Sequence, residues 1–168
     1  MTTDTTDIHP TLIPVLAKVP DPEVPVLTVL DLGIVRSGHL QEDGSVHLRI
    51  TPTYSGCPAM NMIEVNLRAA LQDAGYKQIQ VETVLSPAWT TDWMSESGRQ
   101  KLKAYGIAPP ARGTVDKHAL FGEESSIPCP NCDAEDTRMV SQFGSTACKS
   151  HYVCNACQEP FDYFKCHR

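Results

Sequence analysis

The sequence predicts an α+β fold, in which a small sheet carries helices on one face, followed by a cysteine-rich C-terminal module. Three patterns support this prediction. Residues 46–51 alternate between apolar and polar side chains, residues 60–74 repeat apolar side chains every three or four positions, and six of the seven cysteines lie in the last quarter of the chain. The length of 168 residues suits one domain and a small added module.

The predicted sheet domain begins with a short helix and a loop. Apolar residues recur at helical spacing within residues 11–19, whereas we expect residues 1–10 to be disordered. Three prolines between Pro20 and Pro25 exclude a regular helix or a central strand there, because proline lacks the backbone donor that both structures need. This segment is therefore predicted to be a shaped loop that leads into the first strand.

Two strands, a long helix and a third strand follow the loop. Residues 33–51 are predicted to form two strands joined at Asp43 and Gly44, a pair suited to a hairpin turn. The periodic helix of residues 60–74 comes next, and residues 77–86 alternate as a third strand. The order helix, strand, strand, helix, strand predicts a small αββαβ sheet with its helices on one face.

The domain boundaries are predicted from composition. Ser95 or Ser97 is expected to cap one further helix, so that the sheet domain extends over residues 11–108. Proline, glycine and charged residues are frequent in residues 109–126, which indicates a linker. Residues 127–168 then form the cysteine-rich module.

Two Cys-x-x-Cys pairs define the module. Cys129 and Cys132 form the first pair and Cys154 and Cys157 the second, with 21 residues between the pairs. A two-residue spacer lets both thiolates of a tight turn reach one ion at about 2.3 Å, and a second turn completes a tetrahedron. The spacing therefore predicts a zinc ribbon with a structural Zn²⁺ ion.

Three further potential ligands lie outside this tetrahedron. They are Cys148, Cys166 and His167. Cys148 is expected to be a small buried apolar residue, since a free cysteine commonly takes that role. The alternative is that these residues enter the ligand shell or help to hold an iron–sulfur cluster, because thiolate sites accept either centre. Zinc is favoured, since the paired turns suit a closed structural site.

Composition excludes several classes of partner. The net charge of −6 argues against a nucleic-acid-binding surface, which needs clustered Lys and Arg. No apolar run approaches the ~20 residues of a membrane span, and no secretory leader is visible at the N-terminus. We therefore expect a cytoplasmic protein that contacts neither membrane nor nucleic acid; the oligomeric state is not predicted.

Three stretches resemble a known family. "DPEVPVLTVLDLGIV" (residues 21–35) and "ITPTYSGCP" (residues 50–58) are similar to the MIP18 (DUF59) family, small α+β proteins linked to iron–sulfur protein maturation. Together with "WTTDWMSESGRQKLKAYGIAPP" (residues 89–110) and the cysteine module, they resemble the family of D subunits of phenylacetyl-CoA epoxidase, a multicomponent system of aerobic phenylacetate degradation. The resemblance extends over about residues 10–168.

The resemblance implies an accessory role. Other subunits of such systems carry the diiron oxygenase and the flavin/iron–sulfur reductase, so the expected partners are these subunits and the expected task is iron or iron–sulfur centre assembly. The residues it implies at a functional site are Asp21, Glu23, Asp31 and Cys57. The chain itself has no Glu-x-x-His pair for a diiron centre and no Gly-x-Gly-x-x-Gly turn for a dinucleotide. A non-catalytic subunit is therefore favoured over an enzyme.

Cys57 is the candidate functional thiol. It stands between Gly56 and Pro58, where a strand gives way to a helix, so helix N–H groups should lie near its sulfur. We expect them to lower its pKa and to make it a transient ligand for iron or a cluster. The acidic residues of the proline-rich loop, Asp21, Glu23 and Asp31, either assist it or only cap the backbone there.

Two other functions remain open from the sequence. A thiol-dependent enzyme could use Cys57, although no general base adjoins it in the sequence. Alternatively, the zinc ribbon could be an interaction module with no role in metal delivery. Nucleic-acid binding by the ribbon is disfavoured, because its acidic residues outnumber its basic ones.

Overall fold

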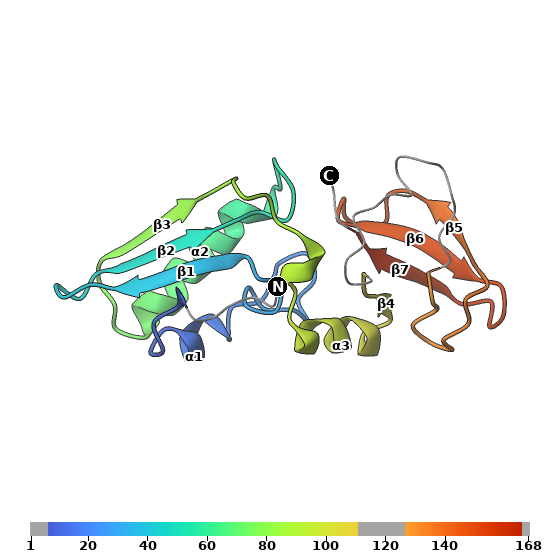
Figure 1. Cartoon of the computed structure of the whole chain (residues 1–168), viewed down its shortest axis with the longest axis horizontal. Coiled ribbons are helices and arrows are strands. Elements are labelled where there is room, and N and C mark those ends of the chain that lie inside the picture. Colours follow the sequence, from blue (N-terminus) through green and yellow to red (C-terminus); the bar gives the residue numbers. More distant parts are fainter. Residues whose placement is uncertain (1–6, 111–126, 166–168) are drawn as a thin grey trace. The chain divides into compact units, whose positions relative to one another are not determined.

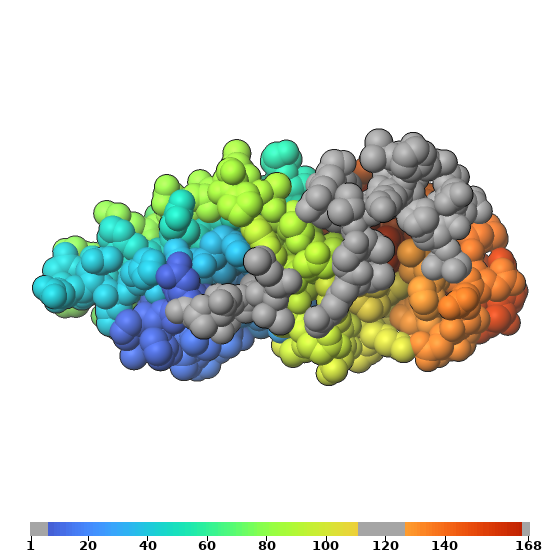
Figure 2. All heavy atoms as spheres, in the orientation of Figure 1, coloured from blue at the N-terminus to red at the C-terminus, as the bar shows by residue number. Residues whose placement is uncertain are grey.

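The chain forms two compact units. The computed structural model describes residues 7–110 and 127–165 (Figures 1 and 2). The first unit ends at Gly98 and the second begins at Arg99. This division lies earlier than the predicted domain end at residue 108. The physical reason is that strand β4 (Ile107–Ala108) pairs in parallel with β7 (Pro160–Phe164), so the residues that lead to the linker belong to the second unit.

The first unit contains the predicted αββαβ sheet. Its strands lie in the order β1-β2-β3, with β1 and β2 antiparallel and β2 and β3 parallel. The elements are α1 (Ile13–Leu16), β1 (Val35–Leu40), β2 (Val46–Ile50), α2 (Ala59–Asp73) and β3 (Ile79–Thr83). Helix α2 connects the two parallel strands across one face of the sheet (Figure 1). The predicted fold class is therefore confirmed, and α1 is one turn within the predicted range.

Local chemistry explains the hairpin between β1 and β2. Gly44 has a φ of +81°, a left-handed conformation that glycine adopts without strain. The Asp43 carboxylate accepts hydrogen bonds from the backbone N–H and the hydroxyl of Ser45 at 2.9 and 2.7 Å. The pKa of Asp43 is lowered, mainly by the hydroxyl bond from Ser45. The turn therefore joins the strands where the sequence predicted it.

The core of the first unit lies between the sheet and its helices. Val46, Leu48 and Ile50 of β2 are buried at alternate positions, opposite buried residues of α2. The helix residues that recur at three- and four-residue spacing are Ala59, Ile63, Leu67 and Leu71. Complete burial stabilises the fold by about 1.5–3 kcal/mol for each large apolar side chain. The periodicities seen in the sequence therefore identify the face that packs.

Of the residues predicted to be disordered, 1–6 lie outside the described part of the chain, whereas Ile8 and His9 are attached to the sheet. Ile8 forms a β-bridge with Gly38, and the His9 N–H donates to the Gly38 carbonyl at 2.7 Å. A Cβ at Gly38 would lie 3.3 Å from the Ile8 side chain and 3.0 Å from Leu48. The absence of a side chain at Gly38 thus lets residue 8 pack against the strand, a contact that local sequence patterns do not reveal.

Helix α3 (Glu96–Ala104) is capped by Ser95. The Ser95 hydroxyl accepts from the Gly98 N–H at 2.9 Å and donates to Asp31 at 3.1 Å. We predict that Ser95→Ala lowers the free energy of unfolding by about 1 kcal/mol, whereas Ser97→Ala, at the exposed second residue of the helix, changes it by less than about 0.5 kcal/mol. Urea unfolding of both variants measures the difference, and equal losses would contradict this assignment of the cap.

The second unit is a four-stranded sheet in the order β4-β7-β6-β5. Strands β5 (Thr137–Ser141), β6 (Lys149–Cys154) and β7 are antiparallel neighbours. A small core contains Ala108, Cys129, Tyr152, Cys154 and Phe161, with the rings of Tyr152 and Phe161 stacked 5.8 Å apart. Two cysteines of the Cys-x-x-Cys pairs thus lie inside this core. No described helix of either unit is long and apolar enough to cross a bilayer.

Candidate metal centre and thiol site

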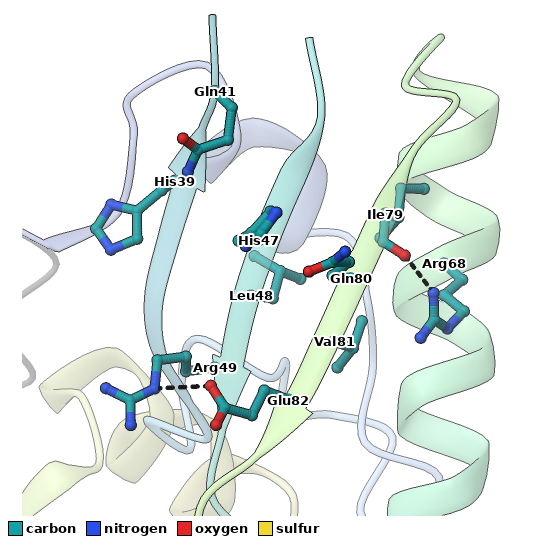
Figure 3. Close-up of a pocket in the computed structure, with 10 residues that line it drawn as sticks. All are labelled: His39, Gln41, His47, Leu48, Arg49, Arg68, Ile79, Gln80, Val81 and Glu82. Atoms are coloured by element: carbon teal, nitrogen blue, oxygen red, sulfur yellow. Dashed lines mark hydrogen bonds and ion pairs between the residues drawn. The ribbon is translucent and has the colours of Figure 1, made fainter. Parts of the chain in front are cut away.

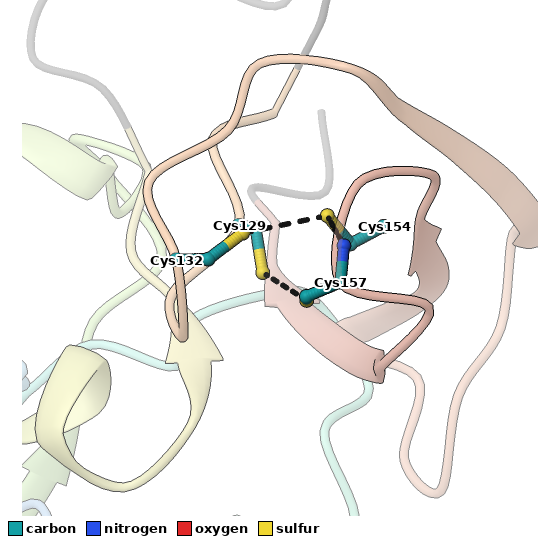
Figure 4. A group of neighbouring side chains, drawn as sticks. All are labelled: Cys129, Cys132, Cys154 and Cys157. Atoms are coloured by element: carbon teal, nitrogen blue, oxygen red, sulfur yellow. Dashed lines mark hydrogen bonds between the residues drawn. The ribbon is translucent and has the colours of Figure 1, made fainter.

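Four cysteines converge at one end of the second unit. Cys129 and Cys132 lie in the turn that precedes β5, Cys154 ends β6, and Cys157 lies in the turn to β7. Their sulfur atoms all lie within 4.8 Å of one another (Figure 4). Cys129 and Cys154 are buried, whereas Cys132 is exposed. The structure therefore brings together the four residues that the spacing singled out.

The sulfur positions fit a tetrahedral metal ion. The Sγ atoms of Cys132 and Cys154 are 3.6 Å apart, and those of Cys129 and Cys157 are 3.8 Å apart. Four sulfurs at about 2.3 Å from a central Zn²⁺ ion would be separated by about 3.8 Å along each edge of the tetrahedron. These two separations match the edges of a closed four-thiolate site, and every other pair of sulfurs lies within 4.8 Å.

The electrostatics of the cluster also favour a cation. The backbone N–H of Cys157 approaches the sulfur of Cys154 at 3.4 Å and lowers the pKa of that thiol to about 7. The pKa of Cys157 is raised to about 12: the backbone N–H of Glu159 favours its thiolate, but burial and the neighbouring sulfurs outweigh that effect. One thiolate thus makes ionisation of its neighbour harder. All four cysteines can be thiolates together only if a cation lies among them.

Two residues beside the cluster were missed by the sequence reasoning. Asp133 and Gln158 have φ values of 59° and 63°, and each directly follows the second cysteine of its pair. Such left-handed conformations are uncommon for residues other than glycine. They turn the chain back at both pairs, which directs the two cysteines of each pair to the same point. The sequence feature that could have identified these two residues is their position immediately after each Cys-x-x-Cys pair.

The additional ligand candidates do not join the cluster within the described part of the chain. Cys148 is buried, and its sulfur lies 3.0 Å from the hydroxyl of Thr146. It is absent from the group of converging metal ligands among the described residues. Its predicted role as a small buried residue fits this position. Cys166 and His167 lie outside the described residues.

Cys57 lies in the first unit, at the predicted junction of strand and helix. Gly56 has a φ of +81°, which makes the sharp turn possible, and Pro58 immediately precedes α2. The sulfur is about half buried and receives a hydrogen bond from the backbone N–H of Ala59 in the first turn of the helix. The predicted contact between this sulfur and a helix N–H group is therefore present.

The predicted lowering of the Cys57 pKa is nevertheless wrong. Burial raises the pKa of this thiol, and the bonds from Ala59 and Tyr54 only partly offset that effect. The charges of Glu23 and Asp21 raise it further. The prediction included the effect of the helix terminus on the pKa. It did not include burial or the charges of these two carboxylates, which act on Cys57 only in the folded protein.

The aspartates of the loop are engaged with the backbone. Asp21 is buried and accepts from the N–H groups of Glu23 and Val24 at 2.9 and 2.7 Å. Asp31, also buried, accepts from both the N–H and the hydroxyl of Thr28 at 3.0 Å, in addition to its bond from Ser95. Both residues thus hold the loop in shape. Glu23 is partly exposed on the side of Cys57.

Two protein-family models match the chain, one in each part. The model described as "Iron-sulfur cluster assembly protein" matches residues 11–84, which include the sheet and Cys57. The model described as "PaaD zinc beta ribbon domain" matches residues 113–165, which include the four-cysteine cluster. The two matches agree with the division between an αββαβ sheet and a ribbon.

Similar proteins cover either one part or nearly the whole chain. The crystal structure of a DUF59 domain from Bacillus anthracis covers 55% of this chain and 88% of that one, with a TM-score of 0.51 and 26% identity. An "Fe-S protein maturation auxiliary factor" of Porphyromonas gingivalis (strain ATCC BAA-308 / W83) is 33% identical over 54% of this chain and 87% of its own length.

A third relative extends over both units. It is a protein of Escherichia coli (strain K12), named as the D subunit of a "Putative 1,2-phenylacetyl-CoA epoxidase", which is 47% identical over 90% of this chain and 88% of its own length. This similarity includes the ribbon as well as the sheet, whereas the maturation factor matches only about half of the chain. The chain therefore belongs to the PaaD family, which comprises the D subunits of phenylacetyl-CoA epoxidase.

Proposed function

We propose that this protein is an accessory subunit of a phenylacetyl-CoA epoxidase system in aerobic phenylacetate catabolism. Its task is to assist the assembly of an iron or iron–sulfur centre in the oxygenase or reductase subunit. Membership of the PaaD family supports the first statement. The match of the first unit to an iron–sulfur cluster assembly model, and to a relative named as a maturation factor, supports the second.

The observation that carries this proposal is the half-buried thiol of Cys57 at the start of α2, whose pKa is raised by burial and also by the charges of Glu23 and Asp21. One sulfur and at least one partly exposed carboxylate offer donors that iron accepts. The carboxylates and burial both raise the Cys57 pKa, so the thiol stays protonated until a cation displaces the proton. Such a group suits iron or a cluster that is held briefly as cargo and then transferred.

The ribbon has a separate role in this proposal. Its four cysteines hold a structural Zn²⁺ ion, for which the sulfur separations of 3.6 and 3.8 Å are suitable. A closed site does not exchange ligands readily with a client protein. The ribbon therefore serves as a stable surface that can bind another subunit, while the first unit handles the cargo.

The raised pKa of Cys57 weighs against a thiol-dependent enzyme. The nucleophile of such an enzyme is the thiolate, and catalytic cysteines usually have pKa values below that of free cysteine. Burial and two nearby carboxylates shift Cys57 in the opposite direction. A metal ion can bind the sulfur by displacing its proton, so a raised pKa does not prevent metal binding. We therefore prefer transfer of iron or a cluster to thiol-dependent catalysis.

A deletion strain tests the proposed function. Without this protein, the oxygenase and reductase subunits should be present in normal amounts, but at least one should contain less iron and show reduced turnover. Iron and acid-labile sulfide per chain, measured on purified subunits, locate the client. The wild-type gene supplied in trans is the control. Full iron content and full turnover in the deletion strain would rule out the assembly role.

A further inference from the structure

A pocket lies on the outer face of the first-unit sheet, and neither Cys57 nor the proline-rich loop is among the residues that line it. Three apolar residues and seven polar side chains line it; the polar ones are His39, Gln41, His47, Arg49, Arg68, Gln80 and Glu82 (Figure 3). Side chains alternate along a strand, and Val46, Leu48 and Ile50 are buried in the core. The residues between them, His47 and Arg49, therefore face away from the core. The proposed function makes no use of this pocket.

Two histidines are cross-strand partners in this pocket. His39 on β1 is the direct antiparallel partner of His47 on β2. Direct partners of this kind project to the same face, with Cβ atoms about 4.5–5.5 Å apart. Both histidines lie in the middle of paired strands rather than on a loop. The backbone therefore holds the two residues as neighbours, although the His39 ring points away from His47 in the structure (Figure 3).

The surroundings of the pair suit a cation. The Nε2 atom of His39 lies 3.8 Å from a carboxylate oxygen of Asp7, and a carboxylate partner of this kind orients a metal-binding histidine through its second ring nitrogen. The guanidinium of Arg49 is paired with Glu82 at 3.2 Å, which offsets its positive charge. Imidazole is a preferred ligand of first-row transition metals. The excess of acidic residues in the whole chain acts in the same direction.

We propose that His39 and His47 form a two-histidine site for a divalent first-row transition-metal ion, with water completing the coordination. The site is separate from the four-cysteine cluster, and the inference does not depend on the proposed function. The His39 side chain is 51% exposed and free to rotate its ring toward His47, since exposed side chains change rotamer within nanoseconds.

Titration of the full-length, zinc-loaded protein with NiCl₂ tests the site. Calorimetry should show one Ni²⁺ ion per chain, and His39→Ala and His47→Ala should each weaken binding by about tenfold or more. Because the two ligands act on one ion, the double variant should be little weaker than either single variant. His9→Ala, which removes an exposed histidine from the same unit, is the matched control and should retain wild-type affinity.

The zinc content measured before and after titration shows whether nickel has replaced zinc in the ribbon; it should stay constant. Circular dichroism should be unchanged in all variants, because the three histidines lie on the surface or in the open pocket. Absence of nickel binding to the wild-type protein would overturn the proposal. An equal loss of Ni²⁺ affinity in His9→Ala would also overturn it. So would losses of affinity in the single variants that add up in the double variant, because both results would mean that His39 and His47 do not bind one ion together.

Discussion

Replacement of Cys154 by serine is expected to abolish stoichiometric metal binding and to unfold the second unit. Cys154 is completely buried, and its sulfur forms one corner of the cluster, 3.6 Å from that of Cys132. Metal binding supplies about 10–16 kcal/mol in small zinc domains, as much as the entire stability of many domains, about 5–15 kcal/mol. Elemental analysis should therefore fall from one zinc ion per chain to none.

Unfolding should include β4 but leave the first sheet intact. Ile107 and Ala108 pair with β7, so their amide signals in an NMR spectrum should lose dispersion with those of the ribbon, while the signals of β1–β3 persist. Cys148→Ser is the matched control, because Cys148 is equally buried but lies outside the cluster and should retain the zinc. A wild-type protein that contains iron and sulfide and absorbs visible light would contradict the zinc assignment.

Cys57→Ser is expected to abolish support of the epoxidase while both units stay folded. Serine is similar in size but offers a poor ligand for iron, and its hydroxyl can still accept the hydrogen bond from Ala59. A deletion strain that carries this variant should therefore accumulate oxygenase and reductase with the same iron deficit as the empty strain. The variant should keep one zinc ion per chain and a wild-type NMR spectrum outside the Gly-Cys-Pro turn.

Alkylation of Cys57 against pH measures the state of the thiol directly. Because burial and the carboxylates raise its pKa, the folded protein should react slowly at neutral pH, with a rate that continues to rise beyond about pH 8.5, near the ordinary pKa of cysteine. Glu23→Gln removes one of the two charges and should shift this profile to lower pH. A thiol that reacts only after unfolding would identify a core cysteine and contradict its role as a ligand. Normal complementation by Cys57→Ser would have the same meaning.

The elements of the first unit were largely predictable because their signals are local. The alternation around Leu48, the helical spacing of Ile63, Leu67 and Leu71, and the turn at Gly44 each depend on residues within a few positions of one another. The same holds for the cysteine pairs, because a two-residue spacer by itself places both thiolates within reach of one ion. What these signals lack is distance information, which is why the attachment of Ile8 to Gly38 was not foreseen.

The sequence by itself determined the αββαβ order, the hairpin and the four cysteines of the ribbon, because periodicity and short spacings act over a few residues. Only the tertiary structure decided that β4 belongs with the ribbon, that Asp21 and Asp31 hold the loop through hydrogen bonds, and that the pKa of Cys57 rises. Strand pairing between distant segments depends on long-range contacts. A pKa depends on burial and on charges that approach only after folding, and neither can be predicted from the residues adjacent to Cys57 in the sequence.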